Sequence, residues 1–315
     1  MSATVERVRA PESVPVAAAR RRSGPSYVFI IGTGRCGSTV LAETVCRHPD
    51  VGFISNIDER FPRLTALTRW NNAIYRRFPS GGVVHKRFIP SEAYGLLDRE
   101  VSPILSSPFR DLKERDAGPW LSRRVEECFA RRAAAQHAPI FLHKFTGWPR
   151  ASFLHRTFPS ARFVHIVRDG RAVANSWLQM PWWRGFGGPE RWQWGPLPPH
   201  LAREWERADR SFVVLAGLLW RMLIEAYDVA REALPDESWL EIRYEDLTAR
   251  PDEVLREILG FSGLRWCTEF DEGFDRGRLH ATRVDAFRRD LDPVELARMT
   301  AAIEPTLTAR GYAPD

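Results

Sequence analysis

The strongest constraint on the fold is a glycine-rich stretch at residues 27–43, which reads YVFIIGTGRCGSTVLAE. An apolar strand pattern leads into a turn, and a helical pattern begins near Ser38. Such an arrangement aims backbone N–H groups and the positive end of a helix dipole at one point, where a phosphate binds. The stretch matches both glycines of the pattern G-x-x-x-x-G-K-[ST], at Gly32 and Gly37, but has serine in place of the lysine. Arg35 supplies a positive charge from a different position in the loop.

Short apolar runs alternate with longer helical patterns along the rest of the chain. This alternation predicts an α/β, P-loop-like three-layer fold with a central, mainly parallel β-sheet of about five strands flanked by helices. The predicted strands are 27–31, 51–55, 139–145, 162–167 and 238–244. The predicted helices are 38–48, 149–158, 171–180, 201–234, 252–259 and 293–310.

The length of 315 residues suits one large α/β domain with its own core, which we expect over residues 27–315. Residues 1–26 are expected to form a disordered tail. They contain charges and prolines but no uninterrupted apolar block followed by a cleavage site, so they do not resemble a secretion signal. Two insertions interrupt the alternation. One is a helical insertion at 60–136, whose helices are expected to pack outside the sheet. The other is a loop at 177–205 that holds six of the twelve tryptophans. The loop can line a binding cleft or plug a hydrophobic surface.

Composition and charge exclude several classes of binding partner. The net charge is +6, but the basic residues are nearly all arginine and are spread among 40 acidic residues, so we expect no nucleic-acid partner. No stretch approaches the roughly 20 apolar residues that span a bilayer, so no transmembrane segment is expected. The four cysteines form no C-x-x-C pair and no metal-like cluster, which predicts a cytoplasmic setting and no metal. Cys36 is expected to fill the loop, because Ala42 stands where a phosphatase would need its arginine.

Two further motifs could contribute to an anion site. In ARFVHIVRDGRAVANSW, a strand ends at Arg168 and Ser176 lies eight residues further on, in a predicted helix. Both side chains can converge on one anionic group, or Arg168 can instead form a salt bridge with Asp169. In LEIRYEDLTARPDEVLREILGF, a strand ends at Tyr244 and Pro251 precedes an amphipathic helix. That segment alone predicts only a strand, a turn and a helix.

In this order and at these separations, the three motifs together resemble the sulfotransferases that use 3′-phosphoadenosine 5′-phosphosulfate (PAPS). GTGRCGST resembles the family's loop for the 5′-phosphosulfate, FVHIVRDGRAVANS its 3′-phosphate motif and RYEDL its adenine-side segment. The stretch HKFTGWPRASFLHRTFPSARF resembles the family's lysine-bearing strand and the helix after it. Arginine at position 35 is closer to the glycan- and tyrosyl-modifying branches. The resemblance covers 27–60, 139–177 and 238–315.

The resemblance implies an enzyme that moves a sulfuryl group from PAPS to a hydroxyl or amine by in-line displacement, without a metal. The acceptor is expected to be a small-molecule, glycan or lipid-linked compound. Arg35 would contact the phosphosulfate, and Lys144 would stabilise the sulfuryl group or the bridging oxygen. The cofactor-binding residues implied are Gly34, Arg35, Cys36, Gly37, Ser38, Thr39, Arg168, Ser176 and Tyr244, with Arg276 and Arg278 as candidates for additional 3′-phosphate contacts.

The general base is open at this stage. In the resembling branches a glutamate shortly after the second strand takes the acceptor proton, and SNIDERF occupies that place here. We expect Glu59 to act as the base, with Asp58 as the second choice. His143 and His85 are further candidates, because histidine has a nearly suitable pKa.

Two other functions are compatible with an altered phosphate loop. One is a small-molecule or nucleotide kinase, which would require ATP and Mg²⁺ and is poorly served by a loop without its lysine. The other is a non-catalytic nucleotide-binding protein on the same fold, which would bind the cofactor without turnover. The sequence alone disfavours both without excluding either.

Overall fold

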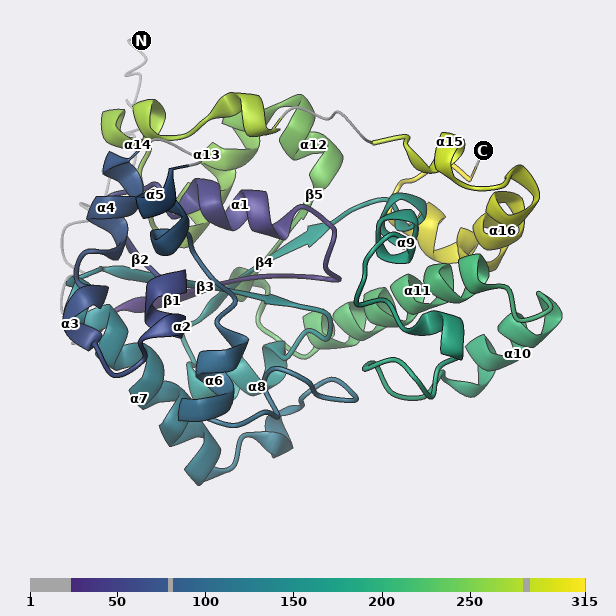
Figure 1. Ribbon diagram of the computed structural model, residues 1–315, viewed down its shortest axis with the longest axis horizontal. Helices are drawn as coiled ribbons and strands as arrows, with labels where there is room; N and C mark the ends of the chain where they lie inside the picture. The colour runs from purple at the N-terminus through teal and green to yellow at the C-terminus, as the bar shows by residue number, and fades with distance from the viewer. Residues whose placement is uncertain (1–23, 79–81, 280–283, 315) are drawn as a thin grey trace, which may run out of the picture.

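A computed structural model describes residues 24–78, 82–279 and 284–314 (Figure 1). At its centre lies a parallel sheet with the strand order β2-β3-β1-β4-β5. The strands are β1 (Ser26–Gly32), β2 (Val51–Gly52), β3 (Ile140–Thr146), β4 (Arg162–Val167) and β5 (Trp239–Arg243). The predicted α/β class and five-stranded parallel sheet are confirmed, although β2 is shorter than expected. The predicted tail at 1–26 lies outside the described residues as far as residue 23.

Both faces of the sheet are covered by helices, which is why its strands are almost continuously apolar. Along β1, Val28 and Ile30 face one helical layer, and Tyr27, Phe29 and Ile31 face the other. The first layer contains α1 (Ser38–Val45), α4 (Asn71–Arg77), α5 (Val83–Phe88), α12 (Tyr244–Ala249), α13 (Pro251–Ser262) and α14 (Thr268–Gly273). The second contains α6 (Tyr94–Glu100), α7 (Pro119–Gln136), α8 (Ala151–Thr157) and the end of α11 (Phe212–Glu232).

A third apolar cluster lies beside the sheet, where α11 packs against α9 and α16 at the right of Figure 1. Its helices are α9 (Gly170–Leu178), α10 (Pro199–Arg207) and α16 (Pro293–Ala309). The shorter elements are α2 (Asn56–Arg60), α3 (Thr65–Thr68), α15 (Phe287–Asp290), η2 (Glu114–Asp116), η3 (Gly185–Gly187), η4 (Asp236–Ser238) and η5 (Arg276–Leu279). No helix in the described ranges is both long and apolar enough to cross a membrane.

The two predicted insertions fold differently from each other. The segment 60–136 forms helices, but α6 and α7 pack on the sheet and belong to its core rather than lying outside it. The stretch between α9 and α10 is irregular apart from η3, yet Trp183, Trp192 and Trp194 are buried in the third cluster. The predicted helix at 201–234 is two helices, because Asp209 and Arg210 adopt left-handed backbone angles.

Parallel pairing brings the carboxyl ends of the strands to one edge of the sheet. Gly32 of β1 pairs with Thr146 of β3, and Val167 of β4 pairs with Arg243 of β5. The chain leaves β1 for β2 and β3 on one side and for β4 and β5 on the other, so the order of strands reverses next to β1. Ligands of open α/β sheets bind at such a point, outside the carboxyl ends of the strands.

Acid should destabilise the fold through His143, which is buried between the rings of Phe129 and Phe145. Burial, with Lys144 adding to it, lowers the pKa of His143 from 6.5 to about 3. Below pH 6.5 the unfolded chain therefore binds a proton that the native protein does not, and this part of the stability is lost as the pH falls. We expect a slope of about 1.4 kcal/mol per pH unit from this residue.

Urea unfolding at several pH values measures this slope. The range runs from 6.5, the ordinary pKa of histidine, down to 4.5, the ordinary pKa of glutamate. A His143→Phe variant should show a smaller slope, whereas the exposed His137→Asn variant should keep it. An unchanged slope in His143→Phe would contradict this role.

Candidate active site

The loop between β1 and α1 has a backbone shaped to surround an anion. Gly34, Arg35 and Gly37 all have left-handed angles, with φ of 83°, 57° and 94°. Loops with such turns gather successive N–H groups into a concave anion site. Helix α1 begins directly afterwards without a side-chain cap or an acidic residue in its first turn, so its positive end is available to an anion.

Close packing leaves no room for side chains at two glycines of the loop. A Cβ atom at Gly32 would lie 2.6 Å from the Sγ of Cys36, which is fully buried beneath the loop. At Gly37 a Cβ atom would lie 2.3 Å from the Cδ2 of Tyr244. The aromatic ring at the end of β5 therefore covers the loop directly, and Cys36 fills the space below it.

The loop is tied to the end of β4 and to α9 by a chain of polar contacts. Arg35 donates from Nε to the Oγ of Ser176 at 2.9 Å. Arg168 donates from Nη1 to the backbone oxygen of Arg35 at 3.1 Å, and its guanidinium lies 4.5 Å from the centre of the Tyr244 ring. Four residues that the sequence predicts for the cofactor are therefore brought together around Gly37.

On the other side of the loop, Lys144 links three segments of the chain. Its Nζ donates to the Oγ1 of Thr39 at 2.8 Å and forms an ion pair with Glu92 at 2.7 Å. Lys144 is only 8% exposed, and an ammonium at that depth needs such partners. Adjacent strand residues point to opposite faces, so Lys144 faces α1 while His143 faces the core on the other side.

Glu92 lies in a tight turn between α5 and α6. Ala93 has a left-handed φ of 51°, an uncommon angle for a residue other than glycine. The Thr146 hydroxyl lies 3.5 Å from both carboxylate oxygens of Glu92, and the Tyr94 hydroxyl accepts the Thr146 N–H at 3.2 Å. Burial raises the pKa of Tyr94, so its hydroxyl is neutral around Glu92.

A cavity of about 310 Å³ joins these groups. Its walls combine the loop, the ends of β3 and α9, the turn that carries Glu92, and the tryptophan-rich segment. The residues lining it are Thr33, Gly34, Arg35, Ser38, Thr39, Glu92, Tyr94, Thr146, Trp177, Trp182, Gln193 and Trp194. A cation, several hydroxyls and a carboxylate thus face one space that is bounded by indole rings.

The two acids that the sequence favoured as bases have structural partners in this arrangement. Asp58 is buried and accepts hydrogen bonds from the side chains of Ser55, Thr68 and Asn71. Glu59 accepts from the Ser91 hydroxyl at 2.7 Å and from the Gly95 N–H at 3.0 Å. Neither is among the described residues that line the cavity, whereas the turn that Glu59 binds is the one that carries Glu92.

Both histidine candidates are also buried away from the cavity. The ring of His143 packs among phenylalanines. His85 stacks on Tyr75 and is bonded through Nε2 to Arg47 at 2.8 Å. Burial, and then the charge of Arg47, lowers the pKa of His85. Each ring is therefore neutral and held by core neighbours.

The two arginines proposed for additional phosphate contacts are paired with carboxylates. Arg276 contacts Asp252 at 3.0 Å and Asp271 at 2.6 Å, and Arg278 contacts Glu43 of α1 at 2.6 Å. These pairs hold η5 against α1, α13 and α14. Contact with a ligand would require either arginine to exchange its carboxylate partner.

Glu92 is the residue that sequence reasoning missed. It falls in the segment 60–136, which the sequence assigned to an insertion outside the sheet. One signal was present, because Glu92 is the sole acidic residue between Glu59 and Asp98. An isolated acid at the end of a long stretch whose other charges are basic needs an explanation, and here the explanation is its pairing with Lys144.

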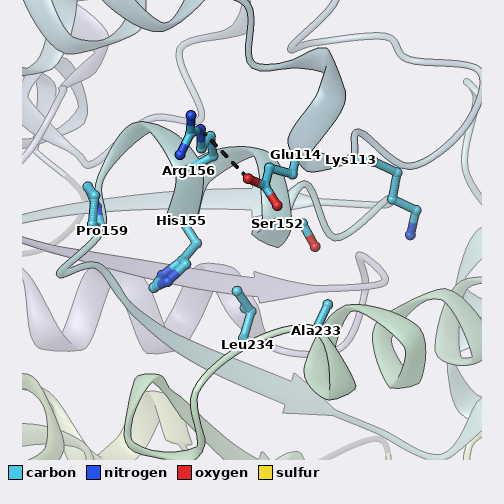
Figure 2. A pocket seen from close by; sticks show the side chains of 8 residues that line it. All are labelled: Lys113, Glu114, Ser152, His155, Arg156, Pro159, Ala233 and Leu234. Carbon is cyan, nitrogen blue, oxygen red and sulfur yellow. Dashed lines mark ion pairs between the residues drawn. The ribbon is translucent and has the colours of Figure 1, made fainter.

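A second cavity, of about 360 Å³, lies at the opposite edge of the sheet, between η2 and the ends of α8 and α11. Figure 2 shows His155, Arg156 and Glu114 on its walls, with Leu234 and Ala233 at the end of α11. Its charges have partners of the opposite sign, since Arg156 faces Glu114 at 3.7 Å and Lys113 pairs with Asp111 at 2.9 Å. The glycine-rich loop of the first cavity is not among the described residues that line it.

Known proteins resemble this chain in sequence pattern and in fold. A family model described as "Sulfotransferase family" matches residues 25–268. The structure of sulfotransferase STF9 from Mycobacterium avium matches with a TM-score of 0.57 and 16% identity, covering 92% of this chain and 78% of that chain. The sulfotransferase domain from the curacin biosynthetic pathway matches with a TM-score of 0.52 and 12% identity, covering 92% and 98%. No curated protein sequence matches the chain.

The close contact at Gly37 predicts a specific sensitivity. A Gly37→Ala change should lower the free energy of unfolding by about 1–3 kcal/mol, because alanine is strained at this left-handed angle. Its methyl group would also collide with Tyr244. Gly260→Ala in α13 is the matched control, since a Cβ atom there would have no neighbouring atom within 4 Å and alanine favours helices.

Urea unfolding of the two variants and the wild type tests this expectation. Adding Tyr244→Ala to Gly37→Ala should recover part of the loss by removing the collision. Equal stability of Gly37→Ala and the wild type would mean that the loop does not adopt this conformation in solution.

Proposed function

The chain belongs to the sulfotransferase family, and we propose that it transfers a sulfuryl group from PAPS to a hydroxyl or amine of an acceptor. The observation that carries this proposal is the position of Lys144, between the phosphate loop and the carboxylate of Glu92. Sulfuryl transfer needs an anion site, a cation at the leaving oxygen and a proton acceptor close together. The loop and the carboxylate of Glu92 line one cavity, and Lys144 contacts both Thr39 and Glu92 on its wall.

The residues around the loop fit the anionic groups of PAPS. Backbone turns at Gly34 and Gly37 and the uncapped start of α1 suit the 5′-phosphate, and Ser38 and Thr39 add hydroxyl donors. The contact between Arg35 and Ser176 puts a cation beside a hydroxyl, a donor set suited to an oxyanion. When bound, PAPS supplies a sulfuryl group on a bridging oxygen that leaves with the phosphate.

On the other side of the loop, Arg168 and Ser176 would hold the 3′-phosphate, and Tyr244 would lie beside the adenine. Cys36 would contribute backbone and bulk beneath the 5′-phosphate rather than a reactive thiol. Arg276 and Arg278 would join the 3′-phosphate site only by leaving their present carboxylates.

Lys144 and Arg35 would neutralise the negative charge that builds on the leaving oxygen. Fixed cations stabilise such charge strongly, because they need little reorganisation during the reaction, and Lys144 is in addition almost fully buried. Thr39 holds the Lys144 ammonium toward the loop. The absent P-loop lysine is thereby replaced by a lysine from β3.

We assign the general base to Glu92. Its carboxylate would take the acceptor proton as the acceptor oxygen bonds to sulfur and the bond from sulfur to the bridging oxygen breaks. The electron pair of that broken bond stays on the phosphate. Glu59 would instead orient the turn through Ser91 and Gly95, and Asp58 would serve the fold.

The acceptor would enter past the tryptophan-rich segment. Trp182, 45% exposed, and Gln193 lie on the wall of the same cavity. Indole faces suit a sugar ring, an aromatic compound or the apolar part of a lipid-linked acceptor. Small-molecule, glycan and lipid-linked acceptors are therefore the classes to assay.

The cysteines support the predicted cytoplasmic setting. All four lie within the described residues and none forms a disulfide. Three of them are buried among apolar side chains. Reduced cysteines of this kind are typical of a reducing compartment.

Nucleotide binding separates this proposal from a kinase. The product 3′,5′-diphosphoadenosine at about 100 times its dissociation constant should stabilise the protein by about 2.7 kcal/mol, visible as a higher melting temperature. ATP with Mg²⁺ should have a smaller effect. Ser176→Ala should weaken the shift caused by the diphosphate. Stabilisation by ATP with Mg²⁺ alone would contradict the proposal and favour the kinase.

Catalysis should depend on Glu92 more than on the other acids. Glu92→Gln keeps the size of the side chain but removes its proton affinity, so turnover should fall by about 10²–10⁴-fold. Binding of 3′,5′-diphosphoadenosine should be nearly unchanged. The assay uses PAPS with a labelled sulfuryl group and a panel of phenol, saccharide and glycolipid acceptors.

Glu59→Gln is the matched control, since it makes the same change in a glutamate that binds the turn carrying Glu92 but does not line the cavity. It should retain more activity than Glu92→Gln. Full turnover by Glu92→Gln together with loss in Glu59→Gln would return the base to Glu59. Cofactor binding without turnover on any acceptor would favour the non-catalytic alternative.

A further inference from the structure

Four apolar side chains form a row on the surface between α2 and α4. The residues are Phe61, Leu64, Leu67 and Trp70, each three positions after the last. The N–H of Leu64 donates to Phe61, that of Leu67 to Leu64 and that of Trp70 to Leu67, at 2.9–3.0 Å. In turns closed by such bonds, side chains three apart lie above one another. We call these four residues the apolar row.

The apolar row is exposed rather than packed. Its four side chains are 46%, 53%, 37% and 48% exposed in sequence order. Single exposed apolar residues are common on protein surfaces, but a contiguous set marks an interaction site. The row is therefore a candidate contact surface for a partner that accepts apolar side chains.

Arginines form a second row beside the first. Arg60, Arg63 and Arg69 each directly precede a member of the apolar row, and all three are exposed. Arg60 and Arg69 lie over the rings of Phe61 and Trp70, at 5.9 and 5.0 Å. Within the described residues, none of the three arginines has a carboxylate partner. We call these three residues the arginine row.

The neighbouring helices α4 and α5 carry the same sign of charge, whereas α7, which contacts α3, adds the exposed acids Glu126 and Glu127. The exposed cations Arg77, Lys86 and Arg87 lie on α4 and α5, which pack against each other, and α5 also contacts α2. Figure 1 shows α2, α3, α4 and α5 together on one side of the molecule. The sequence contains no aspartate or glutamate from residue 60 to residue 91. The described part of the segment 60–91 is therefore both apolar and cationic.

A buried polar network holds the rows in place. Between Leu67 and Arg69, the Thr68 side chain points inward and donates to Asp58 at 2.5 Å. Asn71, which follows Trp70, also donates to Asp58, at 2.6 Å. The inward contacts of Thr68 and Asn71 fix the outward direction of the residues beside them. The apolar row is thus presented by an ordered scaffold.

We propose that the apolar and arginine rows dock the protein on the surface of a membrane that contains anionic lipids. The apolar row enters the boundary between headgroups and acyl chains, and the arginine row binds lipid phosphates. Interfacial segments combine these same two features, apolar residues beside a basic face. Arginine stems also lie along apolar surface while their guanidinium groups stay with the headgroups.

Two other occupants fit the surface less well. A polyanion such as a nucleic acid would use the arginines but would leave the apolar row in water. A second copy of the chain would bring two sets of like charges together across a symmetric interface, which is unfavourable. An anionic lipid surface satisfies both the apolar row and the charges.

Vesicle co-sedimentation of the 315-residue chain tests the proposal. Binding should occur to phosphatidylcholine vesicles that contain phosphatidylglycerol, and should be much weaker with phosphatidylcholine alone. Arg63→Gln with Arg69→Gln should weaken binding roughly 30-fold, because each basic residue near an anionic surface contributes about 1 kcal/mol. Leu64→Ser with Leu67→Ser should weaken it about tenfold or more, through lost apolar burial.

Matched controls lie on the opposite side of the molecule. Phe212→Ser at the start of α11, where the side chain is 53% exposed, controls for the loss of exposed apolar area. Arg203→Gln with Arg207→Gln, on α10, controls for the loss of two charges. Both control variants should bind vesicles as the wild type does, and circular dichroism of every variant should show native folding.

Three results would overturn the proposal. The first is failure of the wild type to bind the anionic vesicles. The second is tight binding to a soluble polyanion together with vesicle binding that the Leu64→Ser, Leu67→Ser variant keeps in full. The third is a dimer, detected by sedimentation velocity, that this same variant abolishes, because the row would then bind a second copy. None of these measurements depends on the chemistry of the active site.

Discussion

The architecture of the site depends on the contacts that Lys144 makes with Thr39 and Glu92. Lys144 lies near the carboxyl end of β3, and almost all of its surface is buried. A buried ammonium is stable only when nearby groups compensate its charge, and it finds them in Thr39 of α1 and in Glu92 of the turn before α6. Three segments that are distant in sequence are therefore held around one charge. The loop, the sheet and the turn can form this constellation only in the folded chain.

Three acids show how environment decides the role of a side chain. Asp58 accepts three side-chain hydrogen bonds and organises α2 to α4, while Glu59 binds the turn that leads to α6. Glu92 has the same functional group but faces a cation and an open cavity. Acid–base chemistry requires access to the reacting atoms as well as a carboxylate. Glu59, which supports the fold, is thus bonded to the same turn that carries Glu92, which faces the cavity.

The tryptophan-rich segment both fills a hydrophobic cluster and lines part of the cavity. Trp183 and Trp192 are buried in the cluster beside the sheet, and stacked rings such as Trp177 and Trp183 anchor the segment. Trp182 is exposed at the cavity wall. A segment without regular secondary structure needs such a core to keep a binding surface in place. The buried tryptophans of the segment therefore hold in place the residues that line the cavity.

Local pattern determined much of this protein. Apolar runs bounded by turns identified the strands, because each run is buried on both faces of a parallel sheet, and the motif around Gly32 and Gly37 identified the loop through its backbone requirements. Parallel pairing then explains why Arg168 and Tyr244, each at a strand end, meet at Gly37. Only the tertiary structure decided that Glu92, rather than Glu59, faces the cavity. Their direction depends on how the helices of residues 60–136 pack against the sheet, and no periodicity in the sequence encodes which side of a turn a lone carboxylate will face.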